Sequence, residues 1–145
     1  MATKRRGRGF SMIEVLVGLF LVGTAVLGLA QLFLIAIANN LKADRVANAT
    51  FLGQQQIDRL RGLTQDELTA YVGTSLESRD EVIDLNLDGT NDFRRITEAR
   101  EAGQTFQVIV HIYSAEKTGA PSAQTLIADP DHYPPRALLS TIITR

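Results

Sequence analysis

One acidic side chain, Glu14, lies at the start of an otherwise apolar stretch of this 145-residue chain. No charged residue occurs from Val15 to Ala38, and four basic residues precede the stretch at positions 4, 5, 6 and 8. A carboxylate in a membrane helix costs free energy, least near the interface, unless a cation offsets it. Glu14 is therefore expected either to sit among lipid headgroups, favoured by the positive end of the helix dipole, or to meet a positively charged partner.

A second group of oxygen-bearing side chains lies in the sequence DLNLDGTND, residues 84–92. Its spacing is that of a calcium loop, in which alternate residues supply hard oxygen ligands and Gly89 permits a sharp turn. An EF-hand would need glutamate where Arg95 stands, so the loop is not an EF-hand. The candidate calcium ligands are Asp84, Asn86, Asp88, Thr90 and Asp92. The alternative is a plain β-hairpin that turns at Asp88-Gly89 with its carboxylates in water.

Other chemistry is largely excluded by composition. The chain has no cysteine, which removes disulfides, thiolate metal sites and cysteine nucleophiles. His111 and His132 have no sequence neighbours that suggest a triad or a zinc site, so we expect no enzyme. Eleven of the fifteen basic residues follow Phe10, against all sixteen acidic ones. This mildly acidic body argues against direct nucleic-acid binding, which needs a basic surface.

The apolar stretch predicts a membrane-spanning helix over residues 10–38. Its 24 uncharged residues from Val15 to Ala38 would extend roughly 36 Å as a helix, enough to cross a hydrocarbon core of about 30 Å. About 100 remaining residues could hardly bury such a helix on all sides. The basic leader orients the segment with its amino terminus in the cytoplasm and the rest of the chain across the membrane.

A cleaved secretory signal is the alternative for this segment. The apolar run is longer than a typical signal-peptide core, and no convincing A-x-A site follows it. The nearest approach, AIANN near residues 36–40, continues into an amphipathic pattern. We therefore expect the apolar helix to stay with the mature protein.

Residues 39–63 continue the helix with an amphipathic pattern. Apolar residues recur near one face at about 100° per residue, with Val46 and Ile57 on its margin. Arg45 and Gln56 interrupt that face, and Gly53 is expected to soften the middle of the helix. Gly62 is expected to end the helix, which gives one long helix from about Ser11 to Arg61. The apolar residues of the face are Ala38, Leu41, Ala49, Leu52, Leu60 and Leu63.

Residues 64–145 are expected to form a globular, β-rich domain. Thr64 and Glu67 match a capping box, and strand patterns follow at 82–87, 93–99, 105–114 and 137–145, with an irregular proline-rich connector before the last. One helix followed by about four antiparallel strands predicts an α+β fold, with a small antiparallel sheet packed on the long helix.

The amino-terminal sequence KRRGRGFSMIEVLVGLF resembles the class III signal of type IV prepilins and type II secretion pseudopilins. It shares their basic leader, glycine, aromatic residue and glutamate within an apolar helix. The resemblance implies cleavage between Gly9 and Phe10 by a prepilin peptidase, which removes residues 1–9, and N-methylation of Phe10. It also implies that Glu14 pairs with the Phe10 amine of a neighbouring subunit during filament assembly.

The same resemblance implies a pilin-like roll and a set of partners. These are other pilin or pseudopilin subunits, the prepilin peptidase, an inner-membrane assembly platform and membrane lipid, with the C-terminal domain outside the bacterial inner membrane and later in a filament. The helix lacks the proline of many major pilins, which favours a minor pilin or pseudopilin. The runner-up is an uncleaved, single-pass anchored module that binds its partner in a calcium-dependent way.

Overall fold

The computed structural model describes residues 11–114, 116 and 121–144. The predicted leader and the processing pair Gly9-Phe10 lie outside these residues. The chain forms two compact units that divide between Lys42 and Ala43. One helix, α1 (Met12–Arg61), contributes residues to both units.

The first unit holds the apolar part of α1. The side chains from Met12 to Lys42 are exposed almost throughout, and the most apolar window of the helix has a mean hydropathy of 2.4 with none of it buried in the fold. By length and composition this helix can cross a membrane. The helix predicted from Ser11 to Arg61 is confirmed to within one residue at its start.

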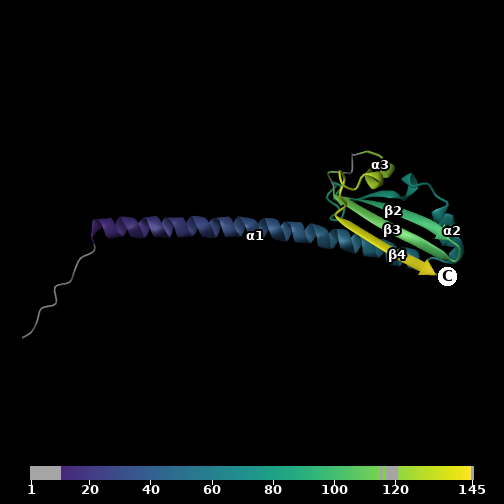
Figure 1. Cartoon of the computed structure of the whole chain (residues 1–145), viewed down its shortest axis with the longest axis horizontal. Coiled ribbons are helices and arrows are strands. Elements are labelled where there is room, and N and C mark those ends of the chain that lie inside the picture. Colours follow the sequence, from purple (N-terminus) through teal and green to yellow (C-terminus); the bar gives the residue numbers. More distant parts are fainter. Residues whose placement is uncertain (1–10, 115, 117–120, 145) are drawn as a thin grey trace, which may run out of the picture. The chain divides into compact units, whose positions relative to one another are not determined.

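The second unit is built on a four-stranded antiparallel sheet in the order β1-β2-β3-β4 (Figure 1). Its strands are β1 (Asp80–Ile83), β2 (Phe93–Ala102), β3 (Thr105–Ser114) and β4 (Ala137–Thr144). Each strand forms an antiparallel pair with the next strand along the chain. The predicted α+β class is confirmed.

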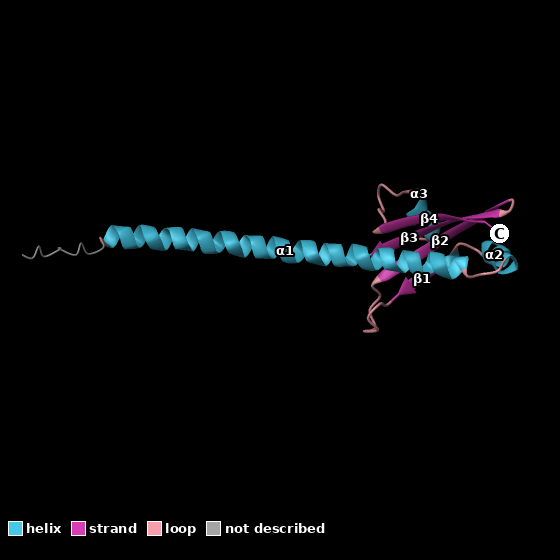
Figure 2. Ribbon diagram, turned by 90° about the horizontal axis from the view of Figure 1, so that it is seen from below, coloured by secondary structure: helices cyan, strands magenta, loops and turns pink. Residues whose placement is uncertain are grey.

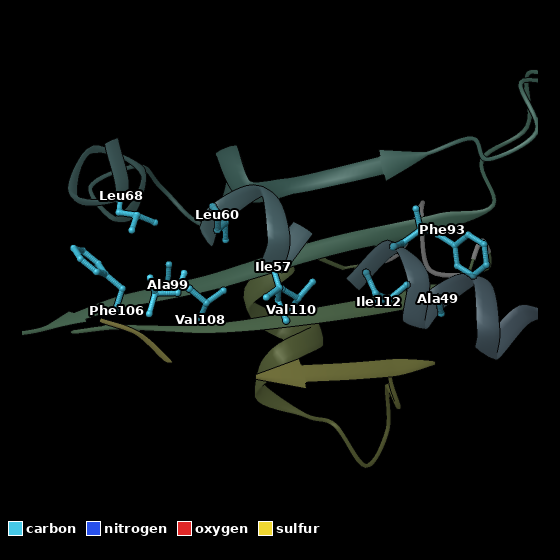
Figure 3. Packing of buried hydrophobic residues seen from close by; sticks show 12 residues of the cluster. Ala49, Ile57, Leu60, Leu68, Phe93, Ala99, Phe106, Val108, Val110 and Ile112 are labelled. Atoms are coloured by element: carbon cyan, nitrogen blue, oxygen red, sulfur yellow. The ribbon is translucent and has the colours of Figure 1, made fainter. Parts of the chain in front are cut away.

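One face of the sheet packs against the second half of α1 (Figure 2). The buried residues of the helix recur every three or four positions, which places them on one stripe: they are Ala49, Leu52, Gly53, Gln56, Ile57 and Leu60. Alternate residues of β3 point at this stripe, since strand side chains alternate between faces. Figure 3 shows Val110 beside Ile57, with Ile112 toward Ala49 at one end of the cluster and Phe106 toward Leu68 at the other.

The first predicted strand, 82–87, is wrong in its second half. β1 ends at Ile83, and Leu87 has a φ of 58°, a left-handed conformation that no strand residue adopts. The backbone amide of Leu85 bonds to the Asp92 side chain instead of a neighbouring strand. Local side-chain bonding has therefore outcompeted the alternating pattern.

Short helices lie beside the sheet in the described part of this unit. The helix α2 (Gln65–Val72) starts at Thr64 with the predicted capping box to Glu67, and a 3-10 turn, η1 (Glu77–Arg79), precedes β1. The helix α3 (Ala123–Ala128) was expected to be irregular connector. Its start is capped by Ser122, and Leu126 is fully buried with Ile96 and Tyr113 on the second face of the sheet, so tertiary packing stabilises a segment too short to form a helix alone.

Candidate functional site

Glu14 lies in the first turn of α1. The amides of Glu14 and Val15 donate to the carbonyl of Ser11, at 2.9 and 3.2 Å, which places the start of the helix directly before this carboxylate. The first amides of a helix have no partner within it and carry the positive end of its dipole, so an acid there is favoured.

No cation of the same apolar helix segment can neutralise Glu14. From Ser11 to Leu41 it is the one charged residue in the sequence, and its neighbours Met12 and Ile13 are exposed apolar side chains. A counter-charge must come from the amino-terminal residues, from lipid or from another molecule.

The acidic loop 84–92 is held by hydrogen bonds between its own side chains and backbone. Asp84 accepts from the amide of Gly89 at 2.8 Å, and Asp92 accepts from the amide of Leu85 at 2.9 Å. Asp88 accepts from the amide and hydroxyl of Thr90 and from the side chain of Asn86. These bonds lower the pKa of Asp88, the Thr90 hydroxyl contributing most.

The five predicted calcium ligands therefore share one loop, but their oxygens are largely engaged with the loop itself. Oδ1 of Asp84, by contrast, is buried and has no hydrogen-bond partner in the described part of the chain. No group of three or more histidine, aspartate or glutamate side chains is placed to hold a metal ion within residues 11–114, 116 and 121–144. As in the alternative interpretation, β1 and β2 pair as an antiparallel hairpin, and the nine residues that connect them include Asp88 and Gly89.

The sequence does not predict the burial of two polar residues, Gln56 and Arg95, that link α1 to the sheet. Gln56 is 2% exposed, and its amide nitrogen donates to the hydroxyl of Tyr71 at 3.1 Å and, at 3.4 Å, to that of Thr97. Arg95 pairs with Glu81 and donates at 3.4 Å to the carbonyl of Leu52 in α1. Gln56 had been counted as an interruption of the apolar face, but it is part of the buried stripe.

The second face of the sheet carries its own buried charges. Arg94 pairs with Asp80 through two bonds of 2.8 and 2.6 Å. Nε2 of His111 lies 3.3 Å from Oε1 of Glu98, and burial lowers the pKa of His111, opposed by the Glu98 charge. Burial also raises the pKa of Tyr113 to about 12. These pairs hold neighbouring strands of the sheet together.

Comparison with known proteins bears on the amino-terminal site. Residues 4–30 match the family described as the prokaryotic N-terminal methylation motif. Neither the curated proteins nor the solved structures give a match to the chain.

The chain carries the class III signal of type IV pilins and pseudopilins on a pilin-like α+β fold. The matched segment contains Gly9, Phe10 and Glu14, the three residues to which the processing and assembly roles were assigned. The motif favours a structural protein that associates with pilin subunits and prepilin peptidase over an enzyme.

Proposed function

We propose that this protein is a minor pilin or pseudopilin, a structural subunit of a type IV pilus or type II secretion filament. The match at residues 4–30 carries the proposal. The apolar part of α1 supports it, because its side chains are exposed and need either lipid or neighbouring helices around them. Before assembly the helix lies in the inner membrane, with the assembly platform as its partner there and the domain on the outer side.

In this proposal the prepilin peptidase cuts after Gly9 and methylates the amine of Phe10. The new amine is the counter-charge that the rest of the apolar helix lacks, and it pairs with Glu14 of a neighbouring subunit. Each subunit then offers one amine and one carboxylate, so the pairing is head-to-tail and continues along a filament.

The test is the mass of the protein extracted from membranes of a host with an active prepilin peptidase. We expect a chain that starts at Phe10 and carries one added methyl group on its terminal amine. A chain that still starts at Met1 or Ala2 would contradict the proposal. That result would favour the uncleaved, single-pass anchored module instead.

We also propose that the loop 84–92 binds calcium. The buried, unpartnered Oδ1 of Asp84 supports this, because a buried carboxylate oxygen without a donor is costly and a cation would satisfy it. Asp92 and Asp88 carry further carboxylate oxygens in the same loop, Asn86 its amide oxygen and Thr90 its carbonyl. Asp88 would exchange its bonds to Thr90 for the metal.

A further inference from the structure

The strand β4 is an edge strand of the sheet. In the described part of the chain β4 pairs with β3 on one side and with no strand on the other. Alternate residues of such an edge strand direct N–H and C=O groups outward, where another strand can bind. Proteins usually block such edges with lysine, proline, a bulge or a very short strand. The eight residues of β4, ALLSTIIT, include no charge and no proline.

The two faces beside this edge differ in chemistry. On the helix side a hollow of about 440 Å³ lies between β4 and α1, bordered by Gln54, Asp58 and Arg61 of the helix and by Thr141 of the strand. On the other side Leu138 and Ile142 are 59% and 67% exposed, large values for apolar residues of a sheet. A second hollow adjoins Ile142 and Gln107 there.

We propose that an extended, uncharged segment of a different protein subunit adds to β4 as a fifth strand. The strand β4 has no charged residue, and the charged pair beside it, Asp58 and Arg61, lies 3.7 Å apart and is balanced. Both observations favour an occupant without charge. Strand side chains alternate between faces. The segment therefore alternates small polar residues, which enter the hollow beside α1, with apolar residues that cover Leu138 and Ile142.

A second copy of this chain is the competing occupant. Two β4 strands paired antiparallel about Ser140 would set Leu138 of one copy beside Ile142 of the other. That arrangement is two-fold symmetric and closes on itself, whereas a filament subunit needs head-to-tail contacts. The preference for a segment of a different protein over a second copy of this chain therefore rests on the proposed function. The processing of residues 9 and 10 is measured separately, so failure of either proposal can be recognised.

The experiment uses the full chain in detergent micelles and a capped eight-residue peptide of alternating threonine and valine. Amide hydrogen exchange is measured by mass spectrometry over residues 137–144. We expect the peptide to slow exchange there by roughly tenfold or more at saturation, because outward amides gain partners. The same peptide with alternate backbone nitrogens methylated should have no effect, since it cannot donate to the edge.

Two variants locate the binding edge. Ile142→Lys places a charge on the exposed side of β4 and should weaken peptide binding roughly tenfold. Val82→Lys is the matched control at a half-exposed position of β1, on the opposite edge of the sheet, and should leave binding unchanged. Both should melt like the parent protein, because both side chains are already exposed.

Three results would overturn the proposal. The first is unchanged exchange over residues 137–144 with the peptide present. The second is equal loss of binding in the two lysine variants. The third is protection of these amides without peptide that increases with protein concentration, which would assign the edge to a second copy of the chain.

Discussion

Glu14 is the residue on which the proposed assembly depends. It stands in the first turn of α1 with apolar neighbours and with no cation on the same apolar segment. Membrane insertion and peptidase cleavage use the basic leader and Gly9, so neither requires the carboxylate. Pairing with the amine of another subunit does require it.

We expect Glu14→Val to leave insertion and processing intact while filament incorporation falls. A hydrogen bond to a charged group is worth about 1.5–3 kcal/mol, so the equilibrium for incorporation should shift roughly tenfold or more. The measurement is the ratio of filament-bound to membrane-bound protein by immunoblot. Gln31→Val, a second polar-to-apolar change in the helix, is the control. Equal incorporation of Glu14→Val and the parent protein would refute the assembly role.

At the scale of elements, the contact of α1 with β4 depends on one glycine. A Cβ built on Gly53 would lie 2.5 Å from Cδ1 of Leu139, closer than atoms in contact can approach. The sequence predicts that Gly53 weakens the middle of the helix. In the structure its missing side chain makes room for Leu139, which sits opposite Val110 in the sheet.

We expect Gly53→Val to destabilise the domain by about 1–3 kcal/mol through overpacking. Gln55→Val, at an exposed position two residues on, should cost only a few tenths, the difference in helix propensity. Urea unfolding of a soluble fragment, residues 39–145, measures both. A double-mutant cycle with Leu139→Ala should recover part of the loss. If the cycle shows no coupling, the clash is not the cause.

The loop 84–92 is the element on which the calcium proposal is decided. If the loop binds calcium in the folded state alone, the fragment 39–145 should melt at a higher temperature in calcium than in chelator. The gain in the free energy of unfolding should be about 2.7 kcal/mol when free calcium is at 100 times its dissociation constant. Magnesium should help less, because it demands a tighter octahedral shell.

Asp88→Asn should abolish this difference, since it keeps the shape of the side chain and removes the charge. Asp129→Asn is the control, because Asp129 caps a separate loop through the amide of His132. Equal melting temperatures in millimolar calcium and in chelator would leave the loop as a hydrogen-bonded connection without a metal.

At the scale of the whole domain, titration should make stability depend on pH. The pKa of His111 is lowered by burial, so acid favours the unfolded chain once the pH falls below about 6.5. Bonds to Thr64 and Thr90 lower the pKa values of Glu67 and Asp88, and their contributions are lost as the pH falls further, below about 4.5. The pKa of Tyr113 is raised to about 12, so the stability of the domain falls as the pH rises from 10 to about 12.

We therefore expect the melting temperature of the fragment to be highest between about pH 7 and pH 10. His111→Gln should remove the loss that begins near pH 6.5 and leave the loss below pH 4.5 in place. Differential scanning calorimetry across this range measures both. An identical profile for the variant and the parent fragment would mean that His111 does not set the acid limb.

The sequence by itself determined the parts that depend on local pattern. The uncharged run before Asn39 specified a helix long and apolar enough to cross a membrane. The alternation of Phe106, Val108 and Val110 specified β3, and the pair Thr64 and Glu67 specified the start of α2. The resemblance of the basic leader, Gly9, Phe10 and Glu14 to the class III prepilin signal agrees with the methylation motif matched at residues 4–30. These signals are read within a few residues, where propensity and burial act together.

Tertiary structure alone decided the features that depend on residues far apart in the chain. Gln56 is buried because Tyr71 and Thr97 satisfy its amide, and Arg95 because Glu81 and the helix carbonyl of Leu52 do. A polar residue is read as exposed until its partners are known, since burial without them is costly. The same holds for α3, which depends on packing against Tyr113.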